Sequence, residues 1–386
     1  MKIKLNFCRA AFILLTASLL LTGGCSKKES TSSSSSASSS STSSSSSGSL
    51  PVSEITQSVD GGYNTGSFVV PSDGVSFILS VFRDNNGSTA FYSLSDPDGT
   101  DILSSSSSPT LSSVASGSSG ASGYANVLVP QSPSFSAKAG TWTFKAYSND
   151  RVKLALRSGT TPTSTTIVVQ PYITGTTWAA GDLSAALSVM SSIYSANGIT
   201  LSINSTITIS DSQYAAVSGT FTDATTSALV SQGGIAAVNL FFIEDYSGSW
   251  SGVLGNAAGI PGSIGIANAW NGVLNSLSAH ASGSTLDPQL LGETAAHEMG
   301  HQLGLFHTTE QGGTSFDILS DTAECPKSSM DNDSNGQMSA EECEGYGGEN
   351  VMFWTAWSSS SRSAGKKQET LSSYQQQVLK YSPIAK

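Results

Sequence analysis

The sequence predicts two folded domains, an all-β sandwich at residues 51–160 followed by an α/β domain with a twisted mixed sheet at residues 161–386. Short segments of alternating apolar and polar residues, separated by turn residues, fill the first part. After a Thr/Pro/Ser linker at 159–166, strand-like segments alternate with segments of helical spacing. The length of 386 residues and the apolar content of 38% suffice for a packed core in each domain.

Residues 1–24 have the layout of an export signal. Three basic residues precede an apolar run at 10–21, which is too short to span a membrane, and small residues then lead to Cys25. The segment Leu21-Thr22-Gly23-Gly24-Cys25 resembles a bacterial lipobox, although Thr22 stands where the usual leucine would be. The resemblance implies cleavage before Cys25 and lipidation of its side chain. The alternative is an ordinary signal peptide with an incidental cysteine.

Residues 25–50 follow as a segment that is almost entirely serine. Such a composition has too little apolar surface to fold, so we expect a disordered tether with an r.m.s. span of roughly 25–30 Å. The tether would hold the folded part clear of a lipid surface.

Charge and cysteine content narrow the class of protein further. Without the signal the chain carries 14 Lys and Arg against 28 Asp and Glu, a net charge of −14, which argues against nucleic acid as a partner.

Cys325 and Cys343 are the cysteines that remain after Cys25. In an oxidising compartment we expect them to form a disulfide, with free thiols or a soft-metal pair as alternatives.

The predicted sandwich strands carry apolar residues at every second position. They are expected at 66–70, 75–82, 91–94, 142–146 and 152–156. The segments 95–99 and 139–144 resemble jelly-roll domains that accompany many secreted bacterial peptidases. Because no catalytic constellation is visible in this part, its expected role is that of a passive spacer.

The α/β part begins with an expected strand at 167–169. A helix is predicted from the N-cap Asp182 to Asn197-Gly198, because apolar residues recur there at helical spacing. Strands are expected at 201–209 and 235–243, the second as a central strand. The Gly-rich segment 253–267 suits a curved edge strand, where an extended peptide could pair.

The segment 297–307 holds three of the four histidines of the chain, in the pattern His-Glu-x-x-His-x-x-Gly-x-x-His. On a helix begun by Asp287 and Pro288, His297 and His301 share a face and can bind one metal ion. Gly304 can adopt the left-handed conformation that ends the helix, which would let His307 return as the third ligand.

Three imidazoles with a fourth position left to water are typical of catalytic zinc. Zinc lowers the pKa of bound water from about 15.7 to about 7 and polarises a carbonyl group. Glu298 is then the candidate general base that carries the proton to the leaving amine. The remaining histidine, His280, lies in a polar neighbourhood and is expected at the surface.

The same motif is the metzincin signature, and Asn350-Val351-Met352-Phe353-Trp354 resembles the methionine turn of that family. The resemblance implies a metzincin-type catalytic domain with an active-site helix, and Met352 as an apolar floor below the imidazoles. The segments 304–308, 317–322 and 254–258 look like the pappalysin branch. Many metzincins have tyrosine where this chain has Trp354, and indole cannot bind zinc.

Residues 331–342 fit the twelve-residue EF-hand loop. Gly336 would make the turn, and Ser339 would contribute a direct or water-mediated contact. Calcium would be bound by the side chains or carbonyl groups of Asp331, Asp333, Asn335, Gln337 and Glu342. A solvated acidic loop is the alternative. Cys325 and Cys343 bracket the loop, and calcium is expected to be structural.

The sequence therefore predicts a zinc endopeptidase that is anchored by lipid to a bacterial cell surface or outer membrane, or released from it. Its expected partners are a protein or peptide substrate and, through the N-terminal lipid, a membrane; we expect a monomer. The alternative is a non-catalytic binding lipoprotein with a vestigial zinc site. The intact Glu298 favours the enzyme.

Overall fold

The computed structural model describes residues 52–55, 57–60, 62–82, 89–103, 124–133, 136–147, 151–160 and 164–386. The predicted signal, the tether and the lipidation site Cys25 lie outside these residues, so the predictions for them stay predictions. Among the described helices, none combines the length and the apolar character that crossing a bilayer would need.

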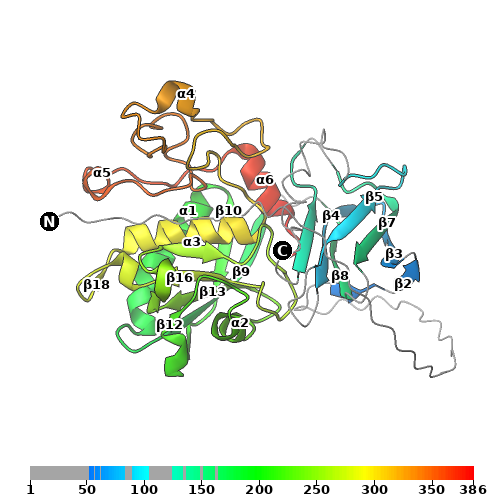
Figure 1. Cartoon of the computed structure of the whole chain (residues 1–386), viewed down its shortest axis with the longest axis horizontal. Coiled ribbons are helices and arrows are strands. Elements are labelled where there is room, and N and C mark those ends of the chain that lie inside the picture. Colours follow the sequence, from blue (N-terminus) through cyan, green and yellow to red (C-terminus); the bar gives the residue numbers. More distant parts are fainter. Residues whose placement is uncertain are drawn as a thin grey trace, which may run out of the picture.

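The N-terminal part consists of two antiparallel sheets, with strand orders β1-β8-β4-β6 and β2-β3-β7-β5. Figure 1 shows this part in blue and cyan. Its strands are β1 (Val52–Glu54), β2 (Gln57–Asp60), β3 (Tyr63–Val70), β4 (Gly74–Phe82), β5 (Phe91–Ser95), β6 (Tyr124–Val129), β7 (Gly140–Tyr147) and β8 (Arg151–Ser158). The predicted strands are present, whereas β1, β2 and β6 were not predicted.

The two sheets share one apolar core, and we call them together the sandwich. Strand β7 alternates buried and exposed residues along its length, as the sequence pattern predicts. Trp142 from β7 is fully buried and meets Phe77 from β4 edge to face, with ring centroids 5.0 Å apart. The resemblance to a jelly-roll domain remains a prediction.

The α/β part contains the helices α1 to α6 and a mixed sheet. Its elements are β9 (Thr165–Thr174), α1 (Ser184–Ala196), β10 (Ile199–Ile203), β11 (Ile207–Ile209), β12 (Ala216–Val217), α2 (Ala224–Val230), β13 (Val238–Ile243), β14 (Asp245–Tyr246), β15 (Gly255–Ala257), β16 (Val273–Ser276), β17 (Ala281–Ser282), β18 (Thr285–Leu286), α3 (Pro288–Gln302), α4 (Lys327–Met330), α5 (Ser359–Ser363) and α6 (Ser373–Tyr381).

The mixed sheet runs in the order β10-β9-β13-β16-β15, and β11 also pairs with β9. The first four strands are parallel, and β15 is an antiparallel edge strand. Side chains on one face of β13 pack with α1 and α3, and those on the other face pack with α2. Figure 1 shows α3 lying along the sheet beside α1.

Two details differ from the sequence prediction. Asp182 is not the N-cap of α1: its carboxylate accepts the amide of Ala179 at 2.8 Å, inside a short 3-10 helix at Ala180–Leu183, and α1 begins at Ser184. The predicted strand 201–209 is split into β10 and β11. Both halves pair with β9 in parallel, but Ile203 lies opposite Val169 and Ile207 opposite Tyr172, so the register shifts by one residue between them.

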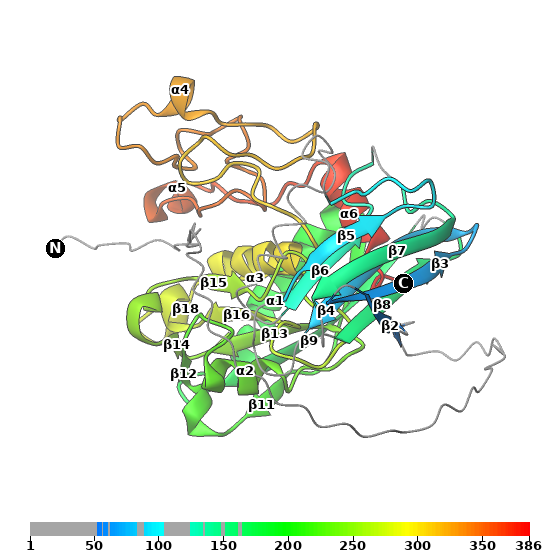
Figure 2. The ribbon, with the colours of Figure 1, turned by 45° about the vertical axis from the view of Figure 1, so that its right-hand side comes forward.

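The sandwich packs directly on the α/β part. Ile78, Leu128 and Ala155 from the sandwich belong to the same apolar cluster as the buried residues of α1 and α3. Polar contacts surround this cluster. The side-chain amide of Asn126 donates to the carbonyl of Pro261 at 3.0 Å, and the guanidinium of Arg157 donates to the carbonyl of Lys380 at 2.7 Å. Figure 1 and Figure 2 show α6, which contains Lys380, beside the sandwich strands.

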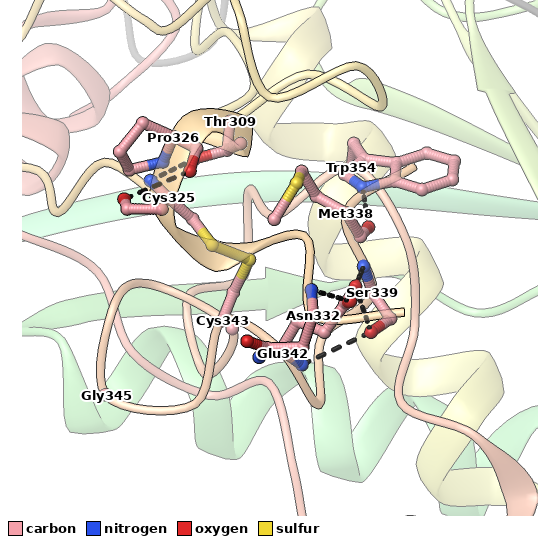
Figure 3. Close-up of a disulfide and its surroundings, with 12 residues drawn as sticks. Thr309, Cys325, Pro326, Asn332, Met338, Ser339, Glu342, Cys343, Gly345 and Trp354 are labelled. Atoms are coloured by element: carbon pink, nitrogen blue, oxygen red, sulfur yellow. Dashed lines mark hydrogen bonds between the residues drawn. A yellow bond between two sulfur atoms is a disulfide. The ribbon is translucent and has the colours of Figure 1, made fainter. Parts of the chain in front are cut away.

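The segment after α3 is held by a disulfide. Cys325 and Cys343 are bonded and completely buried, in a small core with Met338 and Phe353. Figure 3 shows this bond beside the predicted calcium loop. The disulfide that the cysteine content predicted is therefore present.

Candidate metal centre

Helix α3 begins where the sequence predicted. The carboxylate of Asp287 accepts the amides of Gln289 and Leu290 at 3.1 and 3.0 Å, and Pro288 occupies the first turn, where its missing N–H costs nothing. The helix ends at Gln302, and Gly304 has a φ of +110°. A side chain is strained at this φ, which explains the glycine.

The turn at Gly304 brings three imidazoles together. His297 and His301 lie one helical turn apart on α3, and His307 follows the turn. The Nε2 atom of His307 lies 3.2 Å from that of His297 and 3.0 Å from that of His301. The three predicted ligands thus converge on one point.

The other ring nitrogen of each histidine has an oxygen partner. Nδ1 of His297 lies 2.7 Å from the carbonyl of Val351, and Nδ1 of His301 lies 2.7 Å from the carbonyl of Leu305. Nδ1 of His307 lies 3.0 Å from the Oε2 atom of Glu310. Carbonyl and carboxylate oxygens accept hydrogen bonds, so each Nδ1 is assigned the proton, which leaves the lone pair of a neutral ring on Nε2.

The protonation states fit a cation at this point. Burial, together with the neighbouring His307, lowers the pKa of His297 to about 3; burial and the other two rings hold the pKa of His301 well below its ordinary value. Lone pairs at such short separation repel unless a cation lies between them. Tetrahedral zinc with Zn–N bonds of about 2.05 Å would separate two nitrogens by roughly 3.3 Å, close to the observed distances.

Glu298 follows His297 on α3, and its side chain lies against the edge strand β15. Burial raises the pKa of its carboxyl to about 8, and a hydrogen bond from the amide of Ala257 opposes this rise. The close approach of β15 depends on Gly255, where a Cβ would lie 2.6 Å from the Cγ atom of Glu298. The carboxyl is therefore a buried group that can hold or release a proton near neutral pH.

Met352 packs against α3. It is completely buried, and a Cβ at Gly300 of α3 would clash with its sulfur atom. The side chain of Asn350 accepts the amide of Met352 at 2.8 Å, and the carbonyl of Met352 accepts the amide of Thr308 at 3.0 Å. This turn therefore anchors the segment that carries the third histidine.

Trp354 is turned toward the predicted calcium loop. Its indole N–H donates to the carbonyl of Met338 at 2.5 Å, as Figure 3 shows. The amide of Met338 donates to the carbonyl of Gln311 at 2.9 Å. Met338 therefore connects the loop to the segment that follows His307 and to the turn that carries Met352 and Trp354.

The loop 331–342 brings three acidic side chains together. Carboxylate oxygens of Asp331, Asp333 and Glu342 all lie within 4.8 Å of one another. Glu342 accepts the amides of Asn332 and Ser339 at 2.9 and 3.0 Å, and Gly336 has a φ of +83°. Of the other two predicted ligands, the side-chain oxygen of Asn335 accepts the amide of Gln337 at 2.7 Å.

The prediction that His280 lies at the surface is wrong. Its side chain is buried between the end of β16 and α3, where Nδ1 contacts the carbonyl of Ser276 at 2.5 Å and Nε2 contacts the hydroxyl of Thr294 at 2.9 Å. Burial lowers its pKa to about 4. Two hydrogen bonds let a neutral imidazole fill this position, which the polar neighbouring sequence did not indicate.

Sequence reasoning also missed two residues. Glu310 is the hydrogen-bond partner of His307, and Gly255 has no side chain and so leaves room for Glu298 against β15. A carboxylate three residues after a ligand histidine is a signal that could have drawn attention to Glu310. Gly255 offered no such signal, since its role depends on the pairing of β15 with β16.

Two comparisons with known proteins bear on this site. Residues 181–308 match the model of the metallo-peptidase family M12B, reprolysin-like. "Extracellular metalloprotease 1" of Coccidioides posadasii (strain C735) is 41% identical over 93 residues, which are 24% of this chain. This chain spans 32% of the length of that relative. The family match and this relative support a metallopeptidase and hence a hydrolase.

Among solved structures, metalloproteinase-II from Bacteroides fragilis is similar with a TM-score of 0.27 and 12% identity. The similarity covers 69% of this chain and 80% of that one.

Proposed function

We propose that this chain is a zinc-dependent endopeptidase of the metzincin type that hydrolyses peptide bonds in proteins. The observation that carries the proposal is the convergence of three Nε2 atoms on one point, with the buried Glu298 next to His297 on the same helix. His297, His301 and His307 would hold the zinc ion. Bound there, zinc would supply a water of lowered pKa and polarise the carbonyl group of the substrate.

In this proposal Glu298 moves the proton. As general base it accepts the proton of the attacking water, and as general acid it passes that proton to the leaving amine nitrogen. Burial stabilises the protonated form of Glu298, as its raised pKa indicates, so the carboxyl can hold the proton between the two steps. A nearby cation would favour the carboxylate before the reaction begins.

The edge strand β15 is the proposed docking place for an extended peptide. Within the described residues it pairs with β16 on one side and ends the order of the sheet. An extended substrate could add to this edge by backbone hydrogen bonds, which would present its peptide bond beside Glu298.

The proposal extends to the branch of the metzincins and to the cellular location of the protein. The segments 304–308, 317–322 and 254–258 favour the pappalysin-like branch. Export fits the name of the curated relative, an extracellular metalloprotease. Lipidation of Cys25, followed by the serine-rich tether 25–50, would anchor a monomeric enzyme to a bacterial surface or outer membrane. The sandwich is proposed as a jelly-roll-like accessory domain.

Metal content and activity of the purified protein test the proposal together. We expect about one zinc ion per chain, hydrolysis of casein or gelatin, loss of hydrolysis with 1,10-phenanthroline, and recovery when zinc is restored. Folded, zinc-loaded protein without hydrolysis of an unbiased peptide library would favour the binding lipoprotein instead.

We also propose structural calcium in the loop 331–342, with ligands from Asp331, Asp333, Asn335, Gln337 and Glu342. The clustered carboxylates support it, and so does the Oδ1 atom of Asp331, which is buried without a hydrogen-bond partner. A hard cation suits these oxygen atoms.

Calcium should raise the thermal stability of the zinc-saturated protein. At 100 times its Kd it would stabilise the fold by about 2.7 kcal/mol, which corresponds to a rise in Tm of roughly 5–10 °C. Asp333→Asn should lose most of this rise, because it removes one ligand charge. Glu324→Gln, at an exposed position outside the loop, should keep it. A Tm of the wild type that does not respond to millimolar calcium would contradict the proposal.

A further inference from the structure

The three imidazoles of the triad are held in different ways. His297 and His301 lie on the rigid helix α3, and backbone carbonyls accept their Nδ1 protons. His307 lies beyond the helix end, where backbone hydrogen bonds of a helix no longer fix the chain. Its Nδ1 proton goes to a side chain, that of Glu310. The orientation of the His307 ring therefore depends on the position of the Glu310 carboxylate.

Backbone hydrogen bonds fix the position of Glu310. Its amide donates to the carbonyl of Ser315 at 3.0 Å, and its own carbonyl accepts the amide of Gly313 at 2.8 Å. Gly313 has a φ of +58°, and a Cβ there would lie 2.6 Å from the Cγ atom of Met338. The tight loop that carries Glu310 is thus packed against the disulfide-closed segment.

The surroundings of the pair favour a strong interaction. The side chain of His307 is 17% exposed and that of Glu310 is 43% exposed, so the bond is partly shielded from water. A hydrogen bond to an ionised acceptor is about twice as strong as one between neutral groups. Accepting the Nδ1 proton also makes the opposite nitrogen a stronger metal ligand.

We propose that Glu310 is a positioning residue for the third metal ligand: its carboxylate orients the ring of His307 and strengthens the binding of a divalent cation by Nε2. This inference rests on the proposed function, because it takes the triad to be a zinc site. It adds a residue outside the His-Glu-x-x-His-x-x-Gly-x-x-His motif to the parts that determine metal affinity.

The test is the zinc affinity of Glu310→Gln in the full chain, measured by competition with a chromogenic chelator. The neutral amide can still accept the Nδ1 proton, but without the charge we expect the Kd for zinc to rise about 10–100-fold. The visible absorption spectrum of the cobalt(II)-substituted protein should also change, since it reports the geometry of the ligands. Glu324→Gln is the matched control and should leave both readouts unchanged.

The outcomes separate this inference from the proposed function. If the wild type binds no zinc, the proposed site itself fails. If the wild type binds zinc and folded Glu310→Gln has the same Kd and the same cobalt spectrum, the role of Glu310 is overturned. Glu310→Asp keeps the charge at a shorter reach, and it serves as the second variant if thermal unfolding finds the glutamine variant unfolded. An unchanged Kd in folded Glu310→Asp and an unchanged cobalt spectrum overturn the role equally.

Discussion

Glu298→Gln should lower kcat/KM for a protein or peptide substrate by about 10²–10⁴-fold, the usual contribution of a general acid–base group. Glutamine has nearly the same size and can still accept the amide of Ala257, but it cannot accept a proton from water. The histidine ligands are unchanged, so the variant should keep about one zinc ion per chain. Activity assays and metal analysis on the same sample check both statements.

The matched control for this variant is Glu293→Gln. Glu293 lies on the same helix and is also buried, but its carboxylate accepts Gln289 and the amide of Gln368, away from the triad. We expect activity close to the wild type. If Glu298→Gln remained active with its zinc bound, another group would have to carry the proton and the proposed mechanism would be wrong.

Gly304→Ala should destabilise the protein by about 2–5 kcal/mol. A side chain at a φ of +110° costs about 1–2 kcal/mol, and overpacking a full site typically adds about 1–3 kcal/mol. The new Cβ would lie 2.6 Å from Leu128 of the sandwich. Because the turn at Gly304 also places His307, zinc affinity should fall as well. Denaturant unfolding and chelator competition measure the two effects.

Two further variants separate strain from collision. Gly283 also has a positive φ, +65°, but a Cβ there meets nothing within 4 Å, so Gly283→Ala should show the backbone cost alone. In the double variant Gly304→Ala with Leu128→Ala, the shortened side chain removes the collision. The double variant should therefore be destabilised by less than the sum of the destabilisations of the two single variants. Strict additivity would mean that Leu128 does not press on this turn.

The metal centre was largely predictable from the sequence because its signals are local. Asp287 and Pro288 begin α3 through contacts within one turn, and the spacing of His297 and His301 fixes their common face. A glycine three residues later was enough to predict the turn. The alternation of β7 and the nearly continuous apolar run of β13 are also local signals, so both strands were found for the same reason.

The parts that sequence reasoning missed depend on contacts between distant segments. Strand β6 shows neither the alternation of β7 nor the long apolar run of β13, because all six of its residues are buried and Asn126 interrupts a short apolar segment. His280 is buried by α3 and not by its own surroundings. The apolar cluster that joins Leu128 to the α/β core requires knowledge of how the sandwich docks, which no local pattern contains.

Evolution can alter the three imidazole contacts to different extents. The acceptors for His297 and His301 are main-chain oxygens of Val351 and Leu305, and every amino acid supplies such an oxygen. Point substitutions can therefore weaken these contacts only by displacing the backbone. The acceptor for His307 is encoded by a single codon, that of Glu310, so selection can adjust it without altering the path of the chain.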